Sequence, residues 1–421
     1  MNMTRAKREI SYDVRPGATL VSGWWRGIGL VCLVAAATAV AARAQTYTVL
    51  YTFTGGAEGG NPAAGLLLDA AGNLYGTATF GGTGVFFGVV FKLHKEVETV
   101  LHSFAGYPTD GSDPSYAGLV RDDDGNLYGT TRFGGTYDNG TVFKVDRGGK
   151  ETVLYSFTGN ADGANPTAGL VLGKAGNLYG TTSSGGDLSC GGGCGVVFKL
   201  DRTGTETVLH AFTGGADGAN PFAGLVRDQA GNFYGSTING GAPCGYCGVV
   251  FKLDPTGAET VLYAFTGLAD GLVPSDVVLD GAGNLYGTTT FAGDACFCGV
   301  VFKLDPTGNQ TVLYSFTGGT DGGFPVAGLI RDTAGNLYGT TLGGGDPICG
   351  CGVVFKVDPA GNETVLYTFT GGADGASPYA DLVQDRAGNL YGTATNGGDL
   401  SCGCGVVFKL TQLTLPPASE P

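Results

Sequence analysis

Outside its first 44 residues the chain contains no tryptophan and no methionine, and it has only three histidines. These are His94, His102 and His210, and none of them stands where a general base would meet a nucleophile. The sequence also lacks a Gly-x-Ser-x-Gly element, a phosphate-binding loop and a dinucleotide fingerprint. These absences argue against the enzyme classes that those motifs mark.

Basic residues are scarce as well. Residues 1–44 hold six of the 23 Lys and Arg and two of the 37 Asp and Glu, which leaves 17 basic and 35 acidic residues and a net charge of −18 for the rest. Because phosphate binding needs the opposite sign, nucleic acid is excluded as a partner. An acidic balance favours solubility and suits cations.

The first 44 residues have the pattern of an export signal. A basic approach precedes a short apolar run over residues 27–42, and an Ala-x-Ala site ends at Ala44. The alternative, a membrane anchor, needs about 20 apolar residues, and the run is shorter. We therefore predict a signal peptide over residues 1–44, and no comparable apolar segment follows it.

Glycine is abundant, with 79 residues, but it shows no Gly-X-Y period that would indicate collagen. Instead, a Gly-Asn-Leu-Tyr-Gly-Thr string, or a close variant of it, recurs seven times at intervals of 51 to 55 residues. Self-similarity at this period indicates a repeat architecture. A residue present in all seven copies is better explained by structure than by catalysis. The asparagines of the seven strings are Asn73, Asn126, Asn177, Asn232, Asn284, Asn336 and Asn389.

One repeat shows the predicted strands. Short apolar or alternating segments cover 223–228, 232–237, 248–253 and 259–265, with Gly-rich turns between them. Seven units of four antiparallel strands predict an all-β, seven-bladed β-propeller over residues 45–410, followed by a short tail at 411–421. An open β-solenoid is the alternative. Across the last hairpin, Lys252 and Glu259 are expected to face each other.

The chain ends support a closed ring. The segment after the leader, 46–53, matches the fourth strand of a repeat, and the last repeat stops after a third strand at 405–410. The first residues can therefore complete the last blade, which removes free sheet edges. In this arrangement one face carries the tight turns. The other carries the longer, more variable loops, where binding residues usually lie.

The repeat resembles the GloVer tandem repeat of bacterial exported and surface proteins. The resemblance rests on Gly-Leu-Val-x-Asp-x-Ala-Gly-Asn-Leu-Tyr-Gly-Thr-Thr followed by Gly-Val-Val-Phe-Lys-Leu-Asp, and it covers residues 46–410. The Asp-x-x-Gly-Asn-Leu-Tyr half is also similar to NHL and streptogramin-lyase-type blades. The resemblance implies export and a repeat fold, and it supplies no catalytic residues. This chain departs from the family in having no apolar anchoring tail after Leu410.

Apart from Cys32, the ten cysteines form five local pairs, each ending just before a third strand. In an exported protein an even set of paired cysteines predicts disulfides, and pairing inside each loop uses every cysteine. Redox exchange and metal binding by reduced thiols are the alternatives. The predicted bridges are Cys190–Cys194, Cys244–Cys247, Cys296–Cys298, Cys349–Cys351 and Cys402–Cys404.

The blade-to-blade loops carry a recurring Asp before Gly, with Glu58 in the first repeat. One interpretation is a turn in which the carboxylate caps its own backbone. The other is a carboxylate ring that binds Ca²⁺, a cationic ligand or a glycan. No metal site or other cofactor is predicted beyond this option. The candidate residues are Asp110, Asp162, Asp217, Asp270, Asp321 and Asp374.

Breaks in the repeat are the second group of candidates. Asp276 and Asp381 replace a glycine of the inner strand, and Arg121, Arg227 and Arg331 recur on the same strand. These five residues could line the central channel and bind a small polar ligand, with neutral drift as the alternative.

Together these features predict an exported binding or structural module without enzymatic activity, located outside the cell, at its surface or in the periplasm. Its ligand would be a glycan or another cell-surface component such as a protein, held on the loop-rich face. The alternative is a propeller enzyme, a lyase or glycoside hydrolase, that uses carboxylates on that face. No catalytic residue can be named among 35 acids.

Overall fold

The computed structural model describes residues 45–83, 87–116, 118–242, 244–293 and 296–411. They belong to one compact unit, Arg43–Pro421. The predicted signal peptide and the tail beyond residue 411 lie outside the described residues. Among the described residues, no helix is long and apolar enough to cross a membrane.

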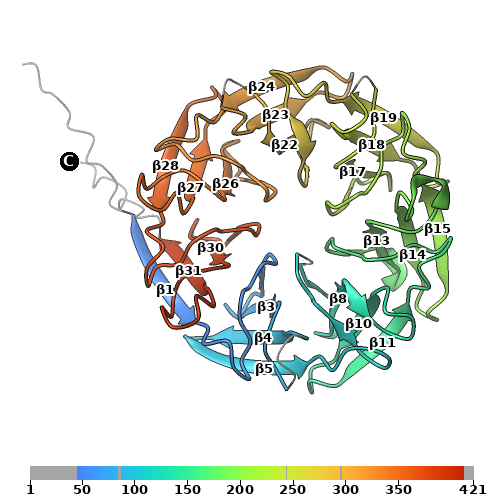
Figure 1. Cartoon of the computed structure of the whole chain (residues 1–421), viewed down its shortest axis with the longest axis horizontal. Coiled ribbons are helices and arrows are strands. Elements are labelled where there is room, and N and C mark those ends of the chain that lie inside the picture. Colours follow the sequence, from blue (N-terminus) through green and yellow to red (C-terminus); the bar gives the residue numbers. More distant parts are fainter. Residues whose placement is uncertain (1–44, 84–86, 117, 243, 294–295, 412–421) are drawn as a thin grey trace, which may run out of the picture. The chain divides into compact units, whose positions relative to one another are not determined.

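Seven four-stranded antiparallel blades surround a central axis, as predicted (Figure 1). The innermost strands have two residues each: β2 (Leu67–Leu68), β7 (Val120–Arg121), β12 (Val171–Leu172), β16 (Val226–Arg227), β21 (Val278–Leu279), β25 (Ile330–Arg331) and β29 (Val383–Gln384). The second strands are β3 (Leu74–Ala78), β8 (Leu127–Thr131), β13 (Leu178–Thr182), β17 (Phe233–Thr237), β22 (Leu285–Phe291), β26 (Leu337–Thr341) and β30 (Leu390–Ala394).

The third strands are β4 (Val89–His94), β10 (Thr141–Val145), β14 (Val196–Leu200), β18 (Val249–Leu253), β23 (Val300–Leu304), β27 (Val353–Val357) and β31 (Val406–Thr411). The outer strands are β5 (Val97–Ser103), β11 (Glu151–Ser156), β15 (Glu206–Ala211), β19 (Glu259–Ala264), β24 (Gln310–Ser315), β28 (Glu363–Thr368) and β1 (Thr46–Thr52). Short elements in the loops are β6 (Gly111–Ser112), β9 (Phe133–Gly134), β20 (Leu272–Pro274) and the 3₁₀ turns η1 (Lys174–Gly176) and η2 (Leu188–Cys190).

The two ends of the ring meet in one blade. Strand β1 pairs antiparallel with β31, from Thr46 opposite Thr411 to Thr52 opposite Val406, so the first strand is the outer strand of the last blade (Figure 1). This pairing closes the ring as the chain ends predict, and it excludes the open solenoid.

The repeated Asp-x-x-Gly-Asn-x-Tyr motif builds the inner hairpin of six blades, and in the third repeat Gly173 takes the place of the Asp. In the fourth repeat, Asp228 accepts hydrogen bonds from the Asn232 amide at 2.8 Å, from the Asn232 side chain at 2.6 Å and from the Tyr234 hydroxyl at 3.1 Å. Gly231 takes a φ of +96°, which a residue with a Cβ rarely adopts. The motif is therefore structural, which explains its recurrence along the chain.

A pair of buried phenylalanines seals each blade-to-blade seam. Phe212 at the end of one outer strand meets Phe251 of the next blade edge to face at 5.2 Å, and the equivalent pairs at the other six seams lie at 5.0 to 5.4 Å. Gly235 leaves room for this ring, because a Cβ there would lie 2.8 Å from Phe251 Cζ. The repeated glycine and phenylalanine therefore form one packing unit.

The residue just before the repeated Thr-Val-Leu of the outer strand faces the preceding blade. At two seams this position holds a hydrogen-bond donor: Gln310 donates to the Asp270 carbonyl at 3.4 Å and Tyr47 donates to the Asp374 carbonyl at 2.5 Å. At the other five seams the position is a glutamate whose Oε1 is buried without a hydrogen-bond partner. We call these the seam glutamates; they are Glu98, Glu151, Glu206, Glu259 and Glu363.

This placement corrects the expected Lys–Glu pairing. Lys252 pairs with Thr260, and Glu259 pairs with Leu253. The turn closes from Asp254 to Ala258, which sets the register one residue away from the expected one, and a one-residue slip sends side chains to opposite faces of a sheet. The same register places Lys144 opposite Thr152, Lys199 opposite Thr207 and Lys356 opposite Thr364.

Candidate binding site on the propeller axis

Seven equivalent inner positions come together around the axis. A Cβ on Gly65 would lie 3.5 Å from the Cβ of Asp381, and one on Gly169 would lie 3.3 Å from the Gly118 carbonyl oxygen. A Cβ on Gly328 would lie only 2.7 Å from that of Asp276. A side chain would therefore be too close at Gly328 and tight at Gly169, whereas at Gly65 it would make an ordinary contact. The full set is Gly65, Gly118, Gly169, Gly224, Asp276, Gly328 and Asp381.

The two aspartates of this ring form a hydrogen-bonded pair. The Gly224 amide donates to Asp276 Oδ1, the Gly328 amide donates to Asp381 Oδ1 at 2.5 Å, and the two carboxyl groups also hydrogen-bond to each other. Burial raises the pKa of both carboxyls, and the charge of Asp381 raises the pKa of Asp276 further. The pair therefore keeps a proton at a pH where an exposed aspartate has lost it.

Three aromatic side chains lie close together, and each comes two residues before one of the seven axial positions in the sequence. Tyr116, Phe222 and Tyr379 come from three different blades, yet the Tyr116 ring centroid lies 5.4 Å from that of Phe222 and 4.8 Å from that of Tyr379. The backbone φ of Tyr116 is +67°, a conformation that is costly for a bulky residue. Strain of this kind is often retained where it positions a functional side chain.

A cavity of about 880 Å³ connects these groups. The two aspartates and the three aromatic residues line it, together with Phe291 and Phe324, whose rings meet edge to face at 5.9 Å. Phe324 also has a positive φ, +59°. None of the described residues that line the cavity is basic. The cavity is thus mostly apolar and aromatic, with two carboxyl groups that present part of their surface to it.

The three arginines expected in the channel lie elsewhere. Each ends an innermost strand and is exposed, and none lines the cavity. The Arg121 and Arg331 guanidinium groups lie 5.9 and 5.4 Å from the rings of Tyr75 and Tyr286 in the preceding blade, and Arg227 lies 5.5 Å from Phe233. The arginine comes three residues after the axial position, and an odd offset in extended chain turns a side chain to the opposite side.

The aspartates of the blade-to-blade loops are bound by their own loops. Asp162 accepts hydrogen bonds from the Thr158 amide at 2.7 Å, from the Thr158 hydroxyl and from the Tyr155 hydroxyl at 3.0 Å. The equivalent Thr contacts, together with Tyr or His contacts, hold Asp217, Asp270, Asp321 and Asp374, and Glu58 is held by Thr54. Each carboxylate caps a loop, and cation binding by this ring stays a prediction.

One loop differs in its partners. Asp110 accepts from the Ala105 amide at 2.9 Å, from the Gly111 amide at 2.6 Å and from His102 at 3.0 Å. Within the described residues, His102, Asp110 and Glu151 are the only three His, Cys, Asp or Glu side chains whose donor atoms lie within 4.8 Å of one another. Asp110 already accepts three hydrogen bonds from the protein, and Glu151 is a seam glutamate. We therefore interpret this group as part of the packing between two blades and not as a metal site.

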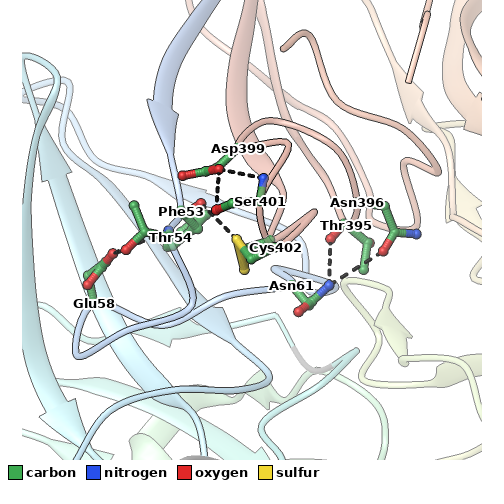
Figure 2. Close-up of a disulfide and its surroundings, with 10 residues drawn as sticks. Phe53, Thr54, Glu58, Asn61, Thr395, Asn396, Asp399, Ser401 and Cys402 are labelled. Atoms are coloured by element: carbon green, nitrogen blue, oxygen red, sulfur yellow. Dashed lines mark hydrogen bonds between the residues drawn. A yellow bond between two sulfur atoms is a disulfide. The ribbon is translucent and has the colours of Figure 1, made fainter. Parts of the chain in front are cut away.

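All five predicted disulfides are present, and each packs against the glycine that opens the next blade-to-blade loop. Figure 2 shows the Cys402–Cys404 bridge where the last blade meets the first: Cys402 Sγ lies 3.9 Å from the Phe53 carbonyl oxygen, and Asn61 donates to the Thr395 carbonyl at 3.0 Å. In the first two blades, Phe87 and Asn139 fill the same place. The bridges therefore serve the packing of the seams.

The axial site was only partly found from the sequence. Its two aspartates stand out because they replace a repeated glycine. The aromatic residues were missed, although all of them also break the repeat: the positions equivalent to Tyr116, Phe222 and Tyr379 hold Ala63, Thr167, Pro274 and Val326 in the other blades. A search for large residues at small or variable positions next to the axis would have found them.

The comparisons with known proteins agree with this architecture. The model of the Gloeobacter/Verrucomicrobia repeat matches residues 36–192 and 189–408. No curated protein matches the chain. Among solved structures, it is similar to the extracellular domains of two B. thetaiotaomicron proteins described as hybrid two component systems. One is 12% identical with a TM-score of 0.55 over 86% of this chain and 41% of that one, and the other 11% identical with 0.56 over 88% and 40%.

At this identity the solved structures show the fold alone, and the chain spans less than half of their length. The repeat model, in contrast, accounts for nearly all of residues 36–408. The chain therefore belongs to the Gloeobacter/Verrucomicrobia repeat family, as the GloVer-like motifs indicated.

Proposed function

We propose that this protein is an exported binding module that holds a small ligand in the axial cavity. The observation that carries the proposal is the concentration of repeat-breaking residues in one place. The seven blades have hairpins, seams and loops of the same kind. Five residues depart from the repeat and line one cavity: Tyr116, Phe222, Tyr379, Asp276 and Asp381. Large apolar pockets with a few convergent polar groups are the usual form of ligand sites.

Two features support export. Disulfides form and persist in oxidising compartments, and this protein has five of them. Residues 1–44 also have the composition of a cleavable signal. Whether the protein is released, kept at the cell surface or held in a periplasm is a separate question that cell fractionation answers.

The geometry favours binding over glycoside hydrolysis. A retaining pair of carboxyl groups stands about 5 Å apart and an inverting pair further apart. Asp276 and Asp381 are in hydrogen-bonding contact, so no sugar carbon fits between them. Both also accept amide hydrogen bonds from the ring, which fixes them in place.

A ligand panel tests the proposal. The chain from residue 45 to 421 is mixed with small glycans, amino acids, amines and carboxylic acids, and thermal unfolding is recorded for each mixture. We expect one chemical class to raise the melting temperature in a saturable manner. Phe222→Ala should abolish that rise, whereas Tyr137→Ala, an exposed tyrosine outside the cavity, should keep it. Ligands that stabilise Phe222→Ala as well as the wild type would place binding elsewhere.

A further inference from the structure

The axial cavity is lined by two acidic side chains and, among the described lining residues, by no basic side chain that could pair with them. Its lining includes Asp276 and Asp381, and none of the described lining residues is Lys, Arg or His. Buried charges in proteins are normally paired. Here the two carboxyls satisfy each other only by retaining a proton, and their remaining partners are the Gly224 and Gly328 amides.

The two acidic side chains of the lining are carboxyls, and its other polar side chains are the hydroxyls of Ser275, Thr290, Tyr116 and Tyr379. The Ser275 hydroxyl, which also lines the cavity, is occupied by Thr288 and the Ala327 carbonyl. The carboxyl oxygens of the two aspartates accept hydrogen bonds, and only the Tyr116 and Tyr379 hydroxyls among the aromatic side chains can donate. An anion would meet the two aspartates without a basic side chain in the described lining to offset them. A ligand that brings donors and positive charge fits this set.

The aromatic residues supply the cavity with rings of the kind that organic cations bind. Tyr116, Phe222 and Tyr379 meet at tilts of 49° and 54° with centroids about 5 Å apart, so their faces do not stack flat on one another. Phe291 and Phe324 add two more rings to the lining. The negative face of an aromatic ring attracts a cation, and groups of such rings recognise quaternary and alkylated ammonium ions.

We infer that the axial cavity binds a small organic cation, an ammonium group with apolar substituents. Its charge lies at the Asp276–Asp381 pair and its apolar part lies among the aromatic rings. This inference rests on the proposed function and gives its ligand a chemical class. The acidic surface of the protein, with a net charge of −14 for the whole chain, assists by attracting cations.

Three probes of similar size and different charge test the inference. They are benzyltrimethylammonium, benzyl alcohol and phenylacetate, and binding is measured by calorimetric titration. We expect saturable binding of the ammonium probe, with binding roughly tenfold or more weaker for the neutral and anionic probes, in keeping with a cation–π and charge contribution above about 1.4 kcal/mol. Affinity should also increase from pH 5 to pH 8, because the cation replaces the proton held by the pair.

A charge-removing double variant is the decisive control. Asp276→Asn with Asp381→Asn keeps the shape and can still accept from the glycine amides, so it should remain folded yet lose the preference for the ammonium probe. Asp123→Asn removes an exposed carboxylate outside the cavity and should change nothing. Equal binding of benzyl alcohol and the ammonium probe, or an unchanged preference in the double variant, would overturn the inference.

The outcome is distinguishable from failure of the proposed function. If a neutral or anionic compound binds and Phe222→Ala abolishes its binding, the cavity is a ligand site but the cation inference is wrong. If Phe222→Ala changes the binding of no compound, both proposals fail. Melting curves of each variant without ligand show whether it is folded.

Discussion

Glutamine at the seam glutamates should stabilise the protein at neutral pH and leave it unchanged in acid. The structure gives the reason at Gln310 and Tyr47, which donate hydrogen bonds to the carbonyl of the preceding blade from the same position. A glutamate can donate there only when it is protonated. We therefore expect the triple variant Glu206→Gln, Glu259→Gln, Glu363→Gln to supply the donor at every pH.

The size and sign of the effect follow from the seam. Burial, and next the charge of the loop aspartate across the seam, raise the pKa of each of the three glutamates from 4.5 to about 7. Because the folded pKa is the higher one, the stabilising contribution is complete below pH 4.5 and is lost as the pH rises to about 7. At about 1.4 kcal/mol per pKa unit, and discounted because each side chain is partly exposed, the loss is about 1–2 kcal/mol per seam.

The assay is denaturant or calorimetric unfolding at pH 4 and pH 8. We expect the triple variant to match the wild type at pH 4 and to exceed it at pH 8 by about 3–6 kcal/mol. Glu96→Gln, an exposed turn residue, is the matched control and should leave the pH dependence unchanged. Parallel pH profiles for the wild type and the triple variant would refute the reasoning, as would a loss of stability at pH 8.

Three further predictions concern the repeat and its loops. Asp162→Ala removes the acceptor of three hydrogen bonds and should lower the free energy of unfolding by about 1–3 kcal/mol, with the same loss in the presence of a chelator. A melting temperature that depends on Ca²⁺ in the wild type but not in the variant would instead favour a cation at this loop. Gly235→Ala would place its Cβ 2.8 Å from Phe251 and 3.0 Å from Leu225, so overpacking of about 1–3 kcal/mol is expected, measured by chemical unfolding, and a neutral result would contradict the packing unit. Cys402→Ser with Cys404→Ser should lower the melting temperature but keep ligand binding, because the bridge lies outside the axial cavity; loss of binding in a folded variant would place the ligand at the disulfide face.

Much of the fold could be predicted because the same sequence pattern occurs in seven repeats. The segments predicted at 232–237 and 248–253 correspond to β17 and β18 to within one residue. The innermost strand was expected over 223–228 but covers only Val226–Arg227, since the preceding residues run beside the axis instead of pairing. The cysteine pairing was also predictable, because pairing inside each loop uses every cysteine and needs no contact between blades.

The details that failed depend on register and on distance in sequence. The predicted Lys252–Glu259 pairing was wrong because the register of the two strands differs from the expected one by one residue. The register depends on the length of the turn, which the amino-acid composition does not determine. Arg121 was assigned to the channel because it shares a strand with an axial glycine, but the odd spacing turns it away. Tyr116 and Tyr379 are separated by 263 positions and meet only because the ring closes, so periodicity alone could not bring them together.

The most direct test of the account is an experimental structure of residues 45–421 with the best ligand from the panel. We predict density for the ligand among Tyr116, Phe222 and Tyr379, with its polar end at Asp276 and Asp381. Density at the loop aspartates or at the disulfide loops, with the axial cavity free of ligand, would contradict it.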